Sequence, residues 1–148
     1  MLTCTFENGS QASLRHVTVD AILIRDEKVL LVRRAEGMLE GGKWALCGGY
    51  VERDETLREA LAREVLEESG YNIKNIKLLT IRDNPDRPHE DRQNISFVFA
   101  CEAGEKIGES DAEVSEQKWF ELSQLPEDSQ IAFDHKENLE VFKTEYQD

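Results

Sequence analysis

Three glutamates in the middle of the chain have the spacing of a metal site. Glu64, Glu67 and Glu68 stand at positions i, i+3 and i+4, so a helix would crowd them onto one side within a single turn. On a helical wheel, Glu64 and Glu68 fall among the apolar positions. Because buried like charges resist ionisation, we expect a divalent cation among them. Carboxylate ligands with open water positions suit Mg²⁺, with Mn²⁺ as an alternative.

The residues around these glutamates predict the helix that carries them. Thr56 and Glu59 form the pattern of a capping box, in which each side chain bonds to the backbone of the other residue. Gly70 is suited to a left-handed cap at the opposite end. We therefore expect a helix over residues 56–69.

The rest of the chain interleaves strand and helix patterns. Runs rich in apolar and β-branched residues predict strands over residues 15–24, 29–32, 44–46, 73–81, 95–101 and 118–120. Apolar periodicity predicts a closing helix over residues 131–146, and residues 33–43 and 82–93 are expected to be loops. These elements indicate an α/β (α+β) fold with a mixed sheet between helices. The length of 148 residues fits a single domain, 1–148.

Composition excludes several classes of partner. A formal net charge of -13 opposes binding to nucleic acid or to an anionic membrane. No apolar run is long enough to span a membrane, and the start of the chain is too polar for a signal peptide. Cys4, Cys47 and Cys101 form no CxxC pair, which excludes a zinc ribbon and favours a reducing, cytoplasmic location.

The segment that begins at Gly49 resembles the Nudix box. Five residues separate Gly49 from Glu55, and seven more precede the run Arg-Glu-Val-Leu-Glu-Glu-Ser-Gly-Tyr at 63–71. Every fixed position is filled, although an aliphatic residue is commoner than Tyr71. The likeness extends from about His16 to the region of Trp119. It implies a Nudix-type α/β/α sandwich that hydrolyses the diphosphate linkage of a small nucleotide substrate.

The resemblance also implies residues that hold the metal and move protons. Glu64, Glu67 and Glu68 match the metal ligands, and the carbonyl group of Gly48 matches a backbone ligand. A glutamate removes a proton from the attacking water. That general base is either Glu64 or Glu113, which stands in a late acidic loop, and the sequence leaves this choice open.

Four further positions match residues that support such a site. Arg63 matches the arginine that orients the glutamates, and Glu55 matches an acid that packs back onto the helix. Gly49 matches a position where a side chain would hinder the backbone, and Gly70 ends the helix. The family usually has proline before the paired glycines, whereas this chain has Cys47, which leaves the approach to them less rigid.

Loop arginines are the candidates for binding the remaining phosphates. The stretch 82–88 is similar to the segment after the box in ADP-ribose pyrophosphatase-like members, and Tyr50 is a candidate contact for a base. We expect ADP-ribose or another nucleoside diphosphate sugar as substrate. The alternatives are an (oxidised) nucleoside triphosphate pyrophosphohydrolase of the MutT-like kind and a non-catalytic nucleotide-binding sensor module. Many relatives form dimers, so a homodimer is also open. The candidate arginines are Arg34, Arg82 and Arg87, with Arg33 and Arg92 as further possibilities.

Overall fold

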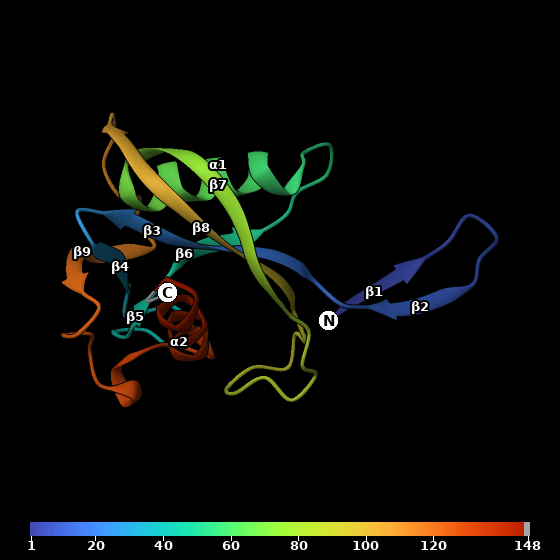
Figure 1. The fold of residues 1–148 in the computed structure, drawn as a ribbon. Coiled ribbons are helices and arrows are strands. Elements are labelled where there is room, and N and C mark those ends of the chain that lie inside the picture. Colours follow the sequence, from blue (N-terminus) through green and yellow to red (C-terminus); the bar gives the residue numbers. More distant parts are fainter. Residues whose placement is uncertain (147–148) are drawn as a thin grey trace.

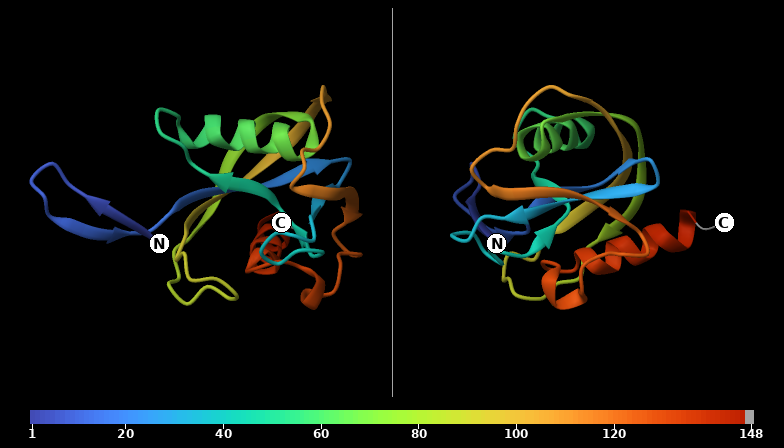
Figure 2. Two further views of the ribbon diagram at one scale, coloured as in Figure 1. Left: turned by 180° about the vertical axis from the view of Figure 1, so that it is seen from behind. Right: turned by 90° about the vertical axis from the view of Figure 1, so that its left-hand side faces the viewer.

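The computed structural model describes residues 1–146. A seven-stranded mixed sheet lies between two helices, α1 (Leu57–Ser69) and α2 (His135–Tyr146), which cover its opposite faces (Figures 1 and 2). This arrangement confirms the predicted fold class. None of the helices in the described residues has the length and apolar content needed to cross a membrane.

The strands of the sheet follow the order β5-β4-β3-β8-β7, with β6 beside β3 and β9 beside β4. A separate hairpin of β1 (Leu2–Thr5) and β2 (Gln11–Leu14) projects from the body of the molecule (Figure 1). A short 3-10 helix, Asp128–Gln130, precedes α2. The strands of the sheet are β3 (Val17–Arg25), β4 (Lys28–Arg34), β5 (Trp44–Ala45), β6 (Cys47–Tyr50), β7 (Tyr71–Arg82), β8 (Ile95–Lys106) and β9 (Val114–Glu121).

Alternation along β3 divides the core into two layers. Val19 and Leu23 pack in the cluster that includes Leu61 and Val65 of α1. Ile22 packs in the cluster that includes α2. Successive side chains of a strand point to opposite faces, so the even-numbered residues of β3 face α2. This face is where the polar residues of β3 are buried.

A short segment fills the opening where β3 and β4 diverge. The two strands pair with each other only near their connecting turn. Farther along, β5 pairs with β4 and β6 pairs with β3. The expected strand over 44–46 is therefore two short strands, and Leu46 lies where the chain changes partner. The paired glycines, Gly48 and Gly49, consequently belong to the sheet and not to a free loop.

Several predicted boundaries were wrong, among them those of the strand over 118–120, which runs from Val114 to Glu121, and two of the shifts have a clear structural cause. The closing helix begins at His135 and not at residue 131, because Ile131 bridges to Trp44 and Phe133 has a φ of 52°, which no α-helix accepts. The first predicted strand starts at Val17 and not at residue 15. The side chain of Arg15 bonds instead to the carbonyl oxygens of residues 83 and 93.

Candidate active site

Local interactions fix the helix that carries the glutamates. The Thr56 N–H donates to Glu59 Oε2 at 2.7 Å, and the Glu59 N–H donates to Thr56 Oγ1 at 3.3 Å. Gly70 ends α1 with a φ of 79°. Ala60, Leu61 and Val65 are fully buried beneath the sheet. This apolar face sets the rotation of α1, and so decides which glutamates turn inward.

Two of the three glutamates point into the molecule. Glu68 is only 6% exposed, and its Oε2 accepts a hydrogen bond from the Gly48 N–H at 2.9 Å. The Glu64 carboxylate lies against Gly49, where an added Cβ would stand 2.5 Å from Glu64 Oε1. The Glu67 side chain remains 48% exposed. Glu64 and Glu68 thus face β6, while Glu67 lies at the rim and is not turned inward with the others.

Arg63 ties the start of the helix to the acidic side chains. Its Nε and Nη2 donate to both carboxylate oxygens of Glu55, at 3.1 and 2.8 Å. Its Nη1 lies 2.8 Å from Glu64 Oε1 and 3.4 Å from Glu67 Oε2. Its Nη2 also donates to the carbonyl oxygen of Tyr50 at 3.0 Å. One guanidinium therefore restrains two glutamates, the preceding loop and the end of β6.

The electrostatics around the glutamates resist ionisation. Burial raises the pKa of Glu64, although Arg63 opposes that shift. Burial, with nearby acids, holds the pKa of Glu68 well above its usual range, despite the hydrogen bond from Gly48. Within residues 1–146, no three Asp, Glu, His or Cys side chains are gathered closely enough to hold an ion as they stand. The site is thus acidic, and its carboxylates repel one another. They lie near one another but do not point at one common position.

These carboxylates line a cavity of about 380 Å³. Glu113 also lines this cavity, together with Asp111. The loop that carries them is bonded in place, since the Asp111 N–H donates to the Glu67 carbonyl oxygen at 2.9 Å. The other lining residues are Thr18, Asp20, Arg34, Met38, Leu46, Gly48, Gly49, Tyr50, Glu52, Arg63, Arg87, Arg92, Asn94, Phe133 and His135.

The structure separates the candidate arginines into two groups. Arg34, Arg87 and Arg92 line the cavity, but Arg33 and Arg82 do not. Arg82 was proposed as a substrate contact from its sequence position. Its Nε instead donates to Asn138 Oδ1 of α2 at 2.7 Å. Arg82 therefore joins β7 to α2, and the placement gives no support to substrate binding by this residue.

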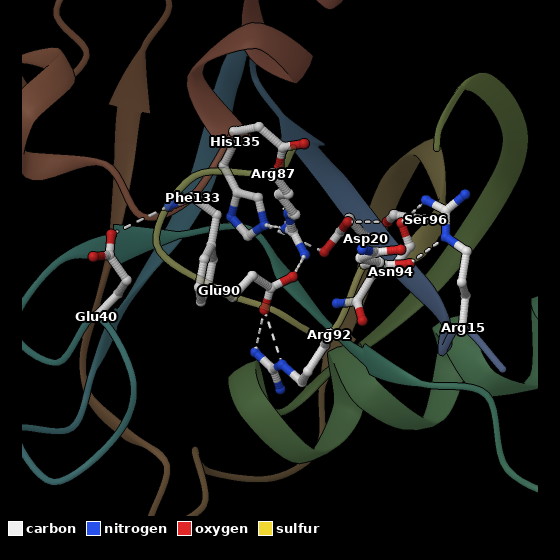
Figure 3. A network of polar contacts seen from close by, with 12 residues as sticks. Arg15, Asp20, Glu40, Arg87, Glu90, Arg92, Asn94, Ser96, Phe133 and His135 are labelled. Carbon is white, nitrogen blue, oxygen red and sulfur yellow. Dashed lines mark hydrogen bonds and ion pairs between the residues drawn. The ribbon is translucent and has the colours of Figure 1, made fainter. Parts of the chain in front are cut away.

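Of the three candidate arginines in the cavity, Arg87 and Arg92 are already held by acids, whereas Arg34 Nε donates to the carbonyl oxygen of Leu39 at 2.7 Å. Arg87 donates to Asp134 at 3.0 Å. It also donates to Glu90 at 2.8 Å, and Arg92 Nε donates to Glu90 at 2.9 Å (Figure 3). Arg92 also donates to the hydroxyl group of Tyr50. Both guanidiniums are thus fixed in direction before any ligand arrives.

Several cavity residues had not been identified from the sequence. One of them is Phe133, whose ring centroid lies 5.1 Å from the guanidinium carbon of Arg34 and 4.8 Å from that of Arg87. Among the described residues, Thr18 Oγ1 and Asn94 Oδ1 are buried without a hydrogen-bond partner. Asp20 gave a usable signal, because it places a charged residue in the middle of a strand rich in Val and Ile. The others come from distant segments whose approach no local pattern encodes.

Comparisons with known proteins agree with this geometry. A NUDIX domain profile matches residues 14–142. The chain is 38% identical over 127 residues to the ADP-ribose pyrophosphatase of Methanocaldococcus jannaschii, covering 85% of this chain and 72% of that protein. The NUDIX domain of Shewanella oneidensis NrtR, complexed with ADP ribose, has a TM-score of 0.75 at 27% identity, covering 91% of this chain and 90% of that one.

A second solved structure carries a metal. This is a bifunctional NMN adenylyltransferase/ADP ribose pyrophosphatase from Francisella tularensis, complexed with AMP and a manganese ion. Its TM-score is 0.71 at 27% identity, covering 89% of this chain and 42% of that one. The profile match, the identity to a relative and the shared fold all point the same way. The chain belongs to the NUDIX domain family and is a Nudix pyrophosphohydrolase.

Proposed function

We propose that this enzyme hydrolyses the diphosphate linkage of ADP-ribose or another nucleoside diphosphate sugar, with Mg²⁺ or Mn²⁺ held by Glu64, Glu67 and Glu68. The observation that carries the proposal is a single cavity lined both by the carboxylates of α1 and by fixed arginines and aromatic rings. A diphosphate ester needs cationic partners and a nucleoside needs flat apolar surfaces, and this cavity offers both. The likeness to proteins named for ADP-ribose supports the substrate class.

The residues present suit a hard divalent cation. The donors are carboxylate oxygens, and the resemblance adds the carbonyl oxygen of Gly48. A cation beside Glu64 and Glu68 would reverse the unfavourable burial that now raises the pKa of both groups. Glu67 is half-exposed, and its contact with Arg63 is long, at 3.4 Å, so its carboxylate has room to turn toward its neighbours. When bound, such an ion neutralises phosphate charge and activates the attacking water.

The protein's own groups position that chemistry. Arg63 holds Glu64 and restrains Glu67, so their carboxylates are presented on one side of the cavity. Either Glu64 or Glu113 accepts the proton of the attacking water, since both line the cavity. The variants Glu64→Gln and Glu113→Gln distinguish the two candidates. The variant that lacks the general base loses the part of the pH–rate profile in which the rate rises as that base ionises.

The other wall of the cavity is suited to the substrate's phosphates and rings. Arg34 and Arg92 can meet phosphate oxygens. Tyr50 and Phe133 offer aromatic surfaces to a base or sugar. Arg34 and Tyr50 stand at the ends of strands β4 and β6, and Arg92 and Phe133 lie in loops, the parts of a fold that usually set specificity.

The test is a substrate panel with product identification. The protein is incubated with Mg²⁺ or Mn²⁺ and ADP-ribose, other nucleoside diphosphate sugars, nucleoside triphosphates including an oxidised one, and capped RNA. We expect ADP-ribose to be turned over fastest, giving AMP and ribose 5-phosphate, with turnover abolished by a chelator. Incubation in heavy-oxygen water shows which phosphorus is attacked. Glu109→Gln, on an exposed loop, is the control variant for glutamate substitutions.

Each other outcome contradicts the proposal. Monophosphate and pyrophosphate as the main products would assign a triphosphate substrate. Binding of ADP-ribose without turnover under any metal would assign a sensor role. Preference for capped RNA would overturn the exclusion of nucleic acid.

A further inference from the structure

The chain changes its sheet partner at Leu46, and this leaves a buried backbone N–H without a strand to bond. Ala45 pairs with β4, whereas Cys47 pairs with β3. The Leu46 N–H donates instead to Nδ1 of His135 at 3.0 Å, across 89 positions of sequence. Leu46 and His135 are both buried, so water cannot replace this bond if it is lost.

The other ring nitrogen of His135, Nε2, is linked to the same segment through Asp20 of β3. Because Nδ1 accepts a hydrogen bond, the proton of the neutral ring is on Nε2. Nε2 lies 3.5 Å from Asp20 Oδ1 (Figure 3). Asp20 in turn lies against Gly48, where an added Cβ would stand 2.7 Å from Asp20 Oδ1. His135 therefore contacts the segment at Leu46 directly and at Gly48 through Asp20.

This segment supplies the donor that fixes Glu68. The Gly48 N–H, two residues after Leu46, donates to the buried Glu68 carboxylate at 2.9 Å. A displacement of the backbone at 46–48 would move that donor. The side chain of Cys47 does not restrict the backbone as proline would, and pairing with β3 begins only at Cys47, so a restraint on Leu46 must come from elsewhere. His135 is bonded at the right place to provide it.

We propose that His135 is a positioning residue, which holds residues 46–48 in place and thereby fixes the carboxylate of Glu68. The inference rests on the proposed function, in which Glu68 binds a divalent ion. His135 stands at the edge of the cavity, and its ring nitrogens face the Leu46 N–H and Asp20. It acts through the backbone, as outer partners of metal ligands commonly do.

Two substitutions separate the roles of the two ring nitrogens. In His135→Asn the amide group stands near the position of Nδ1, so an acceptor for the Leu46 N–H remains. In His135→Gln the longer side chain carries its amide toward the position of Nε2, which keeps the contact with Asp20 and loses the bond to Leu46. His89→Gln, on an exposed loop, is the matched control.

The experiment measures three quantities at a temperature where circular dichroism shows each variant folded. They are hydrogen exchange at the Leu46 amide, Mn²⁺ affinity without substrate, and kcat and KM for ADP-ribose. In His135→Gln we expect faster exchange, with Mn²⁺ affinity and kcat each about tenfold lower and KM within about twofold of wild type. His135→Asn should stay near wild type in all three.

The proposal is overturned if exchange at Leu46 quickens in His135→Gln while Mn²⁺ affinity and kcat stay unchanged. It is equally overturned if His135→Asn loses as much as His135→Gln. Absence of turnover in the wild-type protein would reject the proposed function. In that case exchange and Mn²⁺ binding still decide whether His135 positions the site.

Discussion

The buried carboxylate of Glu68 accepts a hydrogen bond from the backbone of Gly48, so a polar contact joins helix α1 to strand β6 beside an apolar layer. That contact brings an acid from the helix beside the backbone of the paired glycines. It also leaves Glu68 at a position where its charge is costly without a cation.

Replacement of Glu68 by Gln should abolish metal-stimulated turnover and leave the fold intact. Gln keeps an oxygen that can accept the Gly48 N–H, but it lacks the negative charge that a divalent ion requires. Turnover of ADP-ribose and Mn²⁺ binding are measured beside circular dichroism. Undiminished turnover would reject the metal site, provided that Glu109→Gln behaves as wild type.

The metal-free protein should lose stability as pH rises above the ordinary range of a carboxyl group. Because the pKa of Glu68 is raised in the folded state, the native protein binds more protons than the unfolded chain between the two pKa values. The free energy of unfolding therefore falls as pH increases through that window. Melting temperatures in chelator from about pH 5 to about pH 8 measure this slope. Glu68→Gln should flatten it, and parallel slopes would contradict the shift.

The two glycines of β6 should respond differently to alanine. At Gly49 the three atoms nearest to the added Cβ all belong to the Glu64 side chain, which can move. We expect a folded protein with kcat lower by about a hundredfold, because Glu64 is displaced. At Gly48 the Cβ would stand 2.2 Å from the backbone oxygen of Val19, so the strand itself must shift and the melting temperature should fall. Gly37→Ala, where nothing lies within 4 Å, serves as the control.

Arginine substitutions should separate substrate binding from stability. Arg34→Ala removes a guanidinium from the cavity and should raise KM for ADP-ribose about tenfold or more. Arg82→Ala leaves the buried amide of Asn138 without its donor and should lower the free energy of unfolding by about 1–3 kcal/mol, with KM unchanged. Steady-state kinetics and urea unfolding are measured on both variants. A raised KM for ADP-ribose in Arg82→Ala, without a fall in the free energy of unfolding, would support the substrate contact predicted for Arg82 from the sequence.

The parts of the site that were predicted are those encoded within a few residues. Helix α1 and its caps follow from the pattern of Thr56, Glu59 and Gly70, and the inward direction of Glu64 and Glu68 follows from helical periodicity. Such contacts span at most four positions, so one stretch of sequence contains both partners. Glu67, at the rim of the cavity, shows the limit of this reasoning. A helical wheel predicts the direction of a side chain but not how deeply it is buried.

The parts that escaped prediction depend on distant segments meeting. His135 bonds to a residue 89 positions away, and the bond between Arg82 and Asn138 spans 56 positions. Phe133 interrupts an apolar pattern that looked helical, and its left-handed backbone delays the start of α2. No periodicity reports such contacts, since they arise only when α2 packs on the sheet.

The opening between β3 and β4 has a consequence for how this enzyme could diversify. The segment 44–50 pairs with β4 through its first half and with β3 through its second, so the backbone that fixes Glu68 belongs to the sheet. Two residues that would recognise a substrate, Arg92 and Phe133, lie instead in loops. Insertions there could redirect the enzyme to a new metabolite while the bond-breaking apparatus stays as it is.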